Sequence, residues 1–162
     1  MKSLLILRHA KSSPKSPKLS DHDRPLDELA RQDAHRLGGL LRIKELVPDY
    51  IASSTALRAK TTVELVAEGC GYVGEVVFEQ PLYQAKPIDY MKVLERLPDR
   101  YQRVLLVGHN PTIEDTIEIL TGSSNIAMLP CTLAHLVLSI RKWSDLGNGI
   151  DFEAKLIDVL HP

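Results

Sequence analysis

The sequence has few of the residues that mark secreted, membrane-spanning or metal-binding proteins. Only two of its 162 residues are cysteines, Cys70 and Cys131. Their separation fits no metal-binding pattern, so we expect free thiols in a reducing compartment, with a disulfide as the alternative. No apolar run approaches the roughly 20 residues of a membrane span. The first apolar run is also too short for a signal-peptide core. We therefore expect a cytoplasmic protein with no membrane partner.

The net charge and the aromatic content of the chain also do not favour a nucleic-acid partner. The 20 Lys and Arg residues nearly balance the 21 Asp and Glu residues, which leaves a formal net charge of -1, and aromatic residues make up 5%. Such a chain has no general attraction to polyanions, so any anion site must be a local concentration of positive charge. The hydrophobic and charged contents, 44% and 25%, are ordinary for a globular protein. The length predicts a single domain over residues 1–162.

Strand and helix patterns alternate along most of the chain. Continuous apolar runs at 4–7 and 104–107 indicate strands that are buried on both faces. The expected strands are 4–7, 50–52, 76–78, 104–107, 134–140 and 152–160, and the expected helices cover about 30–44, 59–70, 90–97 and 113–120. This alternation predicts an α/β fold with a mostly parallel central sheet and an antiparallel edge.

Chemically active side chains follow three of these strands. Arg8 and His9 come at the end of the first strand, Arg58 lies in the first turn of a helix, and His109 follows the fourth strand. The carboxyl ends of parallel strands meet at one edge, where ligands of α/β sheets bind. Guanidinium groups and helix N-termini both favour phosphate. We therefore predict a phosphoryl site with His9 as nucleophile, and Asn110 as the N-cap of the next helix.

Three segments in this order resemble the signature segments of the histidine phosphatase superfamily, also called phosphoglycerate mutase-like. They are 7–10, 53–61 and 107–111, within a match that runs from 4 to about 122. Arg-His-Ala stands here where the superfamily usually has Arg-His-Gly. The segment 21–26 and the short length resemble the compact SixA phosphohistidine phosphatases. The resemblance implies a three-layer α/β/α fold of the phosphoglycerate mutase type.

The resemblance also implies a role for each matching residue. His9 attacks phosphorus and becomes a transient phosphohistidine, while Arg8, Arg58 and His109 bind the phosphoryl oxygens and Arg24 adds a contact. For this chemistry His9 must be neutral at the attacking nitrogen, and we expect its other nitrogen to donate to a backbone carbonyl. No metal and no cofactor are implied. A phosphate or sulfate ion is the expected occupant of the pocket.

The chain departs from the superfamily pattern at one position that matters for the leaving group. Gln84 stands where related sequences often have a glutamate, and an amide cannot act as a general acid. Asp21 and Asp23 remain as possible proton donors, or as ion-pair partners that orient Arg24. An imidazole leaves more readily than an alkoxide because its pKa is about 6.5.

These features favour a phosphatase that acts through phospho-His9 on phosphohistidine of a phosphocarrier or signalling protein. The short chain leaves little length for a segment that would cover the site, which suits a phosphorylated protein better than a small molecule. One alternative is a phosphatase for a small phosphomonoester, with Asp21 or Asp23 as the acid. The alternative of another class is a non-catalytic module that binds phosphate or phosphohistidine.

Overall fold

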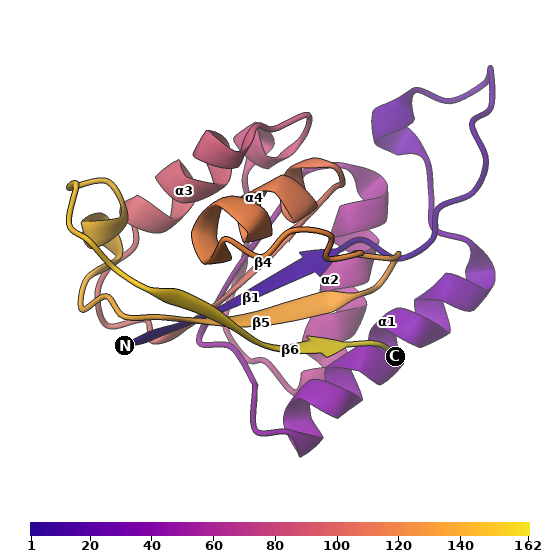
Figure 1. Cartoon of the computed structure of the whole chain (residues 1–162). Coiled ribbons are helices and arrows are strands. Elements are labelled where there is room, and N and C mark those ends of the chain that lie inside the picture. The colour runs from indigo at the N-terminus through magenta and orange to yellow at the C-terminus, as the bar shows by residue number, and fades with distance from the viewer.

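The computed structural model describes residues 1–162, which form one six-stranded sheet covered by helices on both faces (Figure 1). The strands are β1 (Lys2–Arg8), β2 (Tyr50–Ser53), β3 (Val76–Phe78), β4 (Arg103–Gly108), β5 (Leu133–Leu138) and β6 (Ala154–Leu160). The helices are α1 (Glu28–Ile43), α2 (Leu57–Cys70), α3 (Pro87–Glu95) and α4 (Thr112–Thr121). Three short 3₁₀ helices are η1 (Asp21–Asp23), η2 (Gln80–Leu82) and η3 (Trp143–Leu146).

The strand order is β3-β2-β4-β1-β5-β6. The strands β3, β2, β4 and β1 are parallel, whereas β5 pairs antiparallel with β1 and β6 pairs antiparallel with β5. The predicted α/β class, with a mostly parallel sheet and an antiparallel edge, is confirmed. Because β1, β2 and β4 are neighbours and point the same way, the segments that follow them meet at one edge of the sheet.

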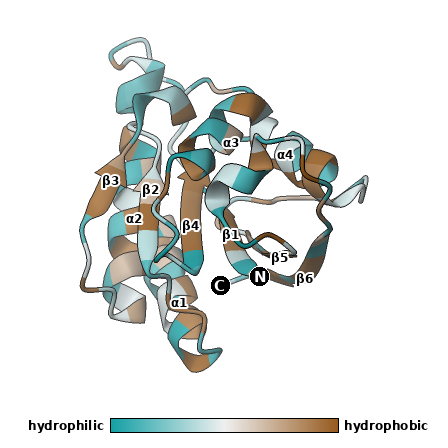
Figure 2. Cartoon of the chain, turned by 90° about the vertical axis from the view of Figure 1, so that its left-hand side faces the viewer, coloured by the Kyte–Doolittle hydropathy of each residue, from teal (hydrophilic) through white to brown (hydrophobic).

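The apolar residues of β1 divide between two cores. Leu5 and Leu7 pack with α1 and α2, and Leu4 and Ile6 pack with α3 and α4. Figures 1 and 2 show these two helix pairs on opposite sides of the sheet. Helices cover both faces of this strand, so apolar residues are needed at every position of the run and not only at every second one. The result is a rigid central strand whose carboxyl end carries the candidate nucleophile.

The contact between α1 and α2 depends on two glycines. A Cβ added at Gly38 would overlap the carbonyl oxygen of Val66, and one added at Gly69 would overlap that of His35. The neighbouring Gly39 has nothing near it. The two helices thus approach at backbone distance, which keeps α2 close under the sheet.

One sequence-based boundary is wrong. Asn110 is not the N-cap of α4, since Pro111 takes that position and the helix begins at Thr112. The Asn110 side chain instead donates to the carboxylate of Glu114 and to the carbonyl oxygen of Met128. Met128 lies 18 residues away from Asn110, so a local capping signal could not reveal this partner.

The remaining expectations from composition concern cysteines and membrane segments. Cys70 and Cys131 are both buried, unpaired thiols. No helix is both long enough and apolar enough to span a bilayer.

Candidate active site

The nucleophile predicted from the sequence, His9, lies directly after β1 and is 8% exposed. Its backbone N–H donates to the carbonyl of Gly108 on the neighbouring strand, which fixes the residue at the edge of the sheet. Its Nδ1 lies 2.7 Å from the carbonyl oxygen of Ala10. A carbonyl can only accept, so Nδ1 carries the proton and Nε2 keeps its lone pair. Nε2 is therefore the nitrogen that can attack phosphorus.

Burial, together with the smaller effects of the positive charges of Arg58, Arg8 and Arg24, lowers the pKa of His9 to about 4 against the opposing hydrogen bond to Ala10. At neutral pH the imidazole is therefore uncharged. A neutral imidazole is the form that acts as a nucleophile.

The second histidine, His109, faces the first. The two ring centroids lie 5.0 Å apart. Nε2 of His109 lies 2.7 Å from Ser54 Oγ, and that hydroxyl oxygen accepts from the Ala56 N–H. In the tautomer in which Nε2 accepts the Ser54 hydroxyl proton, the imidazole proton lies on Nδ1. Nδ1 is buried and has no partner in the protein, so in that tautomer it is a donor free to bind an anion.

Burial lowers the pKa of His109 to about 3, with contributions from His9, Arg58 and Arg8 that exceed the opposing effect of Asp21. Both imidazoles are therefore neutral in the free protein. The positive charge of the site comes from its arginines.

Both arginines predicted to bind phosphate lie at this edge of the sheet. Arg58, the second residue of α2, is 6% exposed and donates from Nη1 and Nη2 to the carbonyl and carboxylate of Asp21. Arg8 donates from Nη1 to the carbonyl of Met128. The Nε atoms of both guanidinium groups are buried and unpartnered. Buried N–H groups without partners are costly, and an oxyanion would satisfy these two together with Nδ1 of His109.

The peptide group of Met128 connects Arg8 to α4. Its carbonyl accepts from Arg8 and Asn110, and its N–H donates to the carboxylate of Glu114 at 2.8 Å. The same carboxylate oxygen accepts from Asn110 at 3.0 Å. Glu114 thus holds the peptide that holds Arg8. Sequence analysis missed this residue because Met128, whose peptide it holds, is 14 residues away in a loop.

Asp21 joins the loop after β1 to the site. Its carboxylate accepts from Tyr83 Oη at 2.7 Å, from Arg58 at 3.1 Å and from Arg24 at 3.1 Å. The hydrogen bond from Tyr83 is the largest of the effects that lower the pKa of Asp21 to about 2. In the free protein this side chain is therefore an ionised acceptor at neutral pH, a state that disfavours proton donation.

The other residues suggested near the leaving group form no hydrogen bond with either imidazole. Arg24 donates to Asp21 and to the Ser13 carbonyl. Asp23 is exposed, and the hydroxyl of Ser20 is the first cause of its lowered pKa. Gln84 is exposed as well. No group of three or more His, Cys, Asp or Glu side chains is placed to hold a metal ion.

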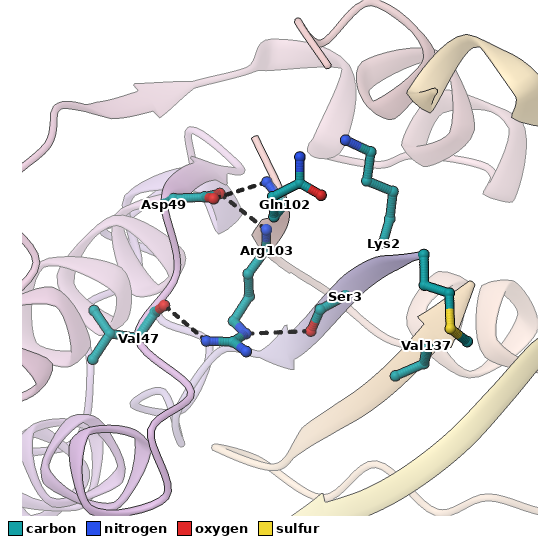
Figure 3. A pocket seen from close by; sticks show the side chains of 8 residues that line it. Lys2, Ser3, Val47, Asp49, Gln102, Arg103 and Val137 are labelled. Atoms are coloured by element: carbon teal, nitrogen blue, oxygen red, sulfur yellow. Dashed lines mark hydrogen bonds between the residues drawn. The ribbon is translucent and has the colours of Figure 1, made fainter. Parts of the chain in front are cut away.

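The surface hollows of the protein do not coincide with this site. One of them, shown in Figure 3, is lined by Lys2, Ser3, Asp49 and Arg103 at the amino ends of β1 and β4. That is the opposite edge of the sheet from His9. None of the four hollows includes His9, Arg58 or His109. The candidate active site is defined by its buried, unpartnered donors and not by a deep cavity.

These features place a neutral imidazole and buried, unpartnered donors together at one edge of an α/β sheet, and comparison with known proteins identifies the class of the protein. The family model of the histidine phosphatase superfamily (branch 1) matches residues 4–82. An uncharacterized protein of Mycobacterium leprae is 34% identical over 120 residues, which are 72% of this chain and 72% of that protein.

Solved structures give the same result. The putative phosphohistidine phosphatase SixA of Agrobacterium tumefaciens is 28% identical and superposes with a TM-score of 0.82 over 99% of this chain and 98% of that one. A tungstate complex of the protein histidine phosphatase SixA, 17% identical, superposes with a TM-score of 0.83 over 98% and 96% and supports the fold. The chain belongs to the histidine phosphatase superfamily and has the SixA-type fold. It is a phosphatase of that superfamily.

Proposed function

We propose that the protein is a metal-independent phosphatase that removes the phosphoryl group from phosphohistidine on a protein, through a phosphorylated His9. One observation carries the proposal: a buried, neutral His9 presents Nε2 beside two arginines whose Nε–H groups lack partners. The arginines supply the positive charge that phosphoryl transfer requires. Arg8, Arg58 and His109 are the proposed ligands of the phosphoryl oxygens.

In the first step, the lone pair of His9 Nε2 forms a bond to phosphorus while the bond from phosphorus to the substrate nitrogen breaks. The electron pair of the broken bond stays on the leaving imidazole, which takes a proton from water. The carbonyl of Ala10 accepts from Nδ1–H of His9 throughout and stabilises the positive charge that develops on the ring. The unpartnered donors bind the oxygens in the transition state.

In the second step, a water molecule attacks phosphorus in line with His9. The bond from Nε2 to phosphorus breaks, its electron pair returns to the imidazole, and inorganic phosphate leaves with the oxygen of that water. The water proton passes to phosphate or to solvent. The burial that keeps His9 neutral favours this return, since it opposes a charged imidazolium.

The protonation state of the site supports an imidazole over an alkoxide as leaving group. Asp21 is held ionised, and Gln84 has an amide in place of a carboxyl group. An alkoxide without a proton donor is a poor leaving group, whereas imidazole has a pKa near 6.5 and is protonated by water. The small phosphomonoester remains the second candidate substrate, because Asp23 is exposed and its carboxylate contacts no arginine.

A phosphocarrier or phosphotransfer domain is the proposed partner, which implies a role in signal transduction in the cytoplasm. The similarity to proteins described as SixA phosphohistidine phosphatases supports this assignment. The first strand and the last both lie beside β5, which supports one domain over residues 1–162. Phosphate itself is the proposed occupant in the resting protein.

The test compares a phosphohistidine-bearing phosphocarrier protein with a phosphoserine peptide. Wild type is expected to prefer the phosphocarrier, and His9→Ala is expected to lose both activities. The exposed His35 gives the matched control, since His35→Ala removes an imidazole outside the site. Rapid acid-free quenching should trap phosphate on His9. Undiminished phosphate release by His9→Ala would refute the mechanism, and faster turnover of phosphoserine would favour the phosphomonoester.

A further inference from the structure

Two aromatic side chains that the mechanism does not use continue outward from His109, Tyr83 beside it and His22 beside Tyr83. The ring centroid of Tyr83 is 5.7 Å from that of His109, in an edge-to-face arrangement. The ring of His22 stands edge-to-face on Tyr83 at 4.8 Å. We call Tyr83 and His22 the aromatic wall. Both rings are partly exposed, so this contact does not close either of them off from a ligand.

Hydrogen bonds hold each ring of the aromatic wall in one orientation. The hydroxyl of Tyr83 donates to the carboxylate of Asp21. Thr55 Oγ1 donates to Gln80 Oε1 at 2.8 Å, so it can only accept from His22 Nε2, 3.0 Å away. Side chains at a solvent-exposed rim are normally free to rotate. Here both are ordered without a substrate, which is the arrangement that binding sites use to lower the entropy lost on association.

The backbone next to Tyr83 is strained. Gln84 has a φ of 53°, in the left-handed region, although it is not a glycine. Its exposed side chain makes no hydrogen bond within the protein that would offset the strain. The conformation at Gln84 turns the chain directly after Tyr83. The strained residue is therefore the immediate neighbour of the residue that supplies the ring. Strain of this kind clusters at functional sites.

The wall extends from His109 toward the exposed rim of the site. His9 is buried, and its Nδ1 faces the Ala10 carbonyl, so Nε2 faces the ligand. In-line attack places the leaving group opposite Nε2, toward the exposed rim. The ring of His109 contacts both His9 and Tyr83. A phosphoryl group bound by His109 would therefore lie close both to the nucleophile His9 and to the aromatic wall.

We propose that the aromatic wall receives the imidazole ring of the phosphohistidine substrate and so sets the preference of the enzyme for that leaving group. The inference rests on the proposed function and adds the residues that recognise the substrate. A planar imidazole stacks on Tyr83 or packs against its edge, whereas a serine side chain or an unsubstituted nitrogen offers no ring. The wall selects among substrates through an aromatic contact, and the arginines bind the phosphoryl group common to all of them.

The experiment compares two substrates with the same type of bond: a phosphohistidine peptide and phosphoramidate, which has a phosphorus–nitrogen bond but no ring. Tyr83→Leu should lower kcat/KM for the peptide by about threefold to tenfold more than for phosphoramidate, the size of one aromatic contact, because the lost hydrogen bond to Asp21 affects both substrates alike. Tyr83→Phe keeps the ring and should keep the substrate ratio. His22→Leu should lower the ratio in the same direction and provides a second variant.

Tyr72 supplies the control, because it is a partly exposed tyrosine after the opposite end of α2. Tyr72→Leu should leave the ratio unchanged. An equal loss on both substrates in Tyr83→Leu and His22→Leu would mean a structural role and overturn the wall as a recognition element, as would an unchanged ratio. If wild type does not hydrolyse the phosphohistidine peptide, or if it prefers a phosphotyrosine peptide, both the proposed function and this inference are overturned. If wild type hydrolyses the phosphohistidine peptide, the substrate ratios of the variants test the aromatic wall separately from the proposed function.

Discussion

The buried state of His9 should make the stability of the protein depend on pH in a defined window. An ordinary histidine has a pKa near 6.5, and burial holds that of His9 at about 4. Between these values the unfolded chain binds a proton that the folded chain refuses, so acidification favours unfolding. The stability is fully present above about pH 6.5 and falls as the pH approaches 4. At about pH 4.5 the linkage relation gives a loss of roughly 2–3 kcal/mol from this residue.

The assay is urea unfolding at about pH 7 and about pH 4.5, followed through the fluorescence of the only tryptophan, Trp143, which is fully buried. His9→Asn keeps a side-chain donor for the Ala10 carbonyl and removes the titrating ring. Its loss of stability between the two pH values should be smaller than that of wild type by roughly 2–3 kcal/mol. His35→Asn, at an exposed position, should behave as wild type. Equal losses in His9→Asn and wild type would refute the assignment.

Two further predictions use matched pairs. Gly38→Ala should destabilise the protein by about 1–3 kcal/mol through overlap with the backbone of α2. Gly39→Ala should stabilise it by up to about 1 kcal/mol. Thermal unfolding measures both changes, and equal effects of the two substitutions would contradict the close approach of α1 and α2. Glu114→Gln should weaken the binding of vanadate about tenfold by releasing the Met128 peptide, while the exposed Glu118→Gln should not change it in calorimetry. Unchanged affinity in Glu114→Gln would show that Arg8 needs no such support.

The parts of the fold that the sequence predicts are those encoded by continuous local patterns. The apolar runs that contain Leu5 and Leu105 identify two neighbouring central strands, and the residues after them could be placed at one edge for that reason. Asp21 and Tyr83 show the limit of the method. They form a hydrogen bond across 62 positions of the chain, and no periodicity in either segment encodes that partner. Asn110 gave a misleading signal because its tertiary partners outcompete local capping.

The position of β1 has a consequence for how the protein is made. This strand is synthesised about a hundred residues or more before its partners in the sheet, β4 and β5. The segment matched by the family model, 4–82, contains neither partner. A nascent chain therefore carries the proposed nucleophile on an unpaired strand until these partners are made. Both edges of β1 are paired only after Leu133–Leu138 has been synthesised.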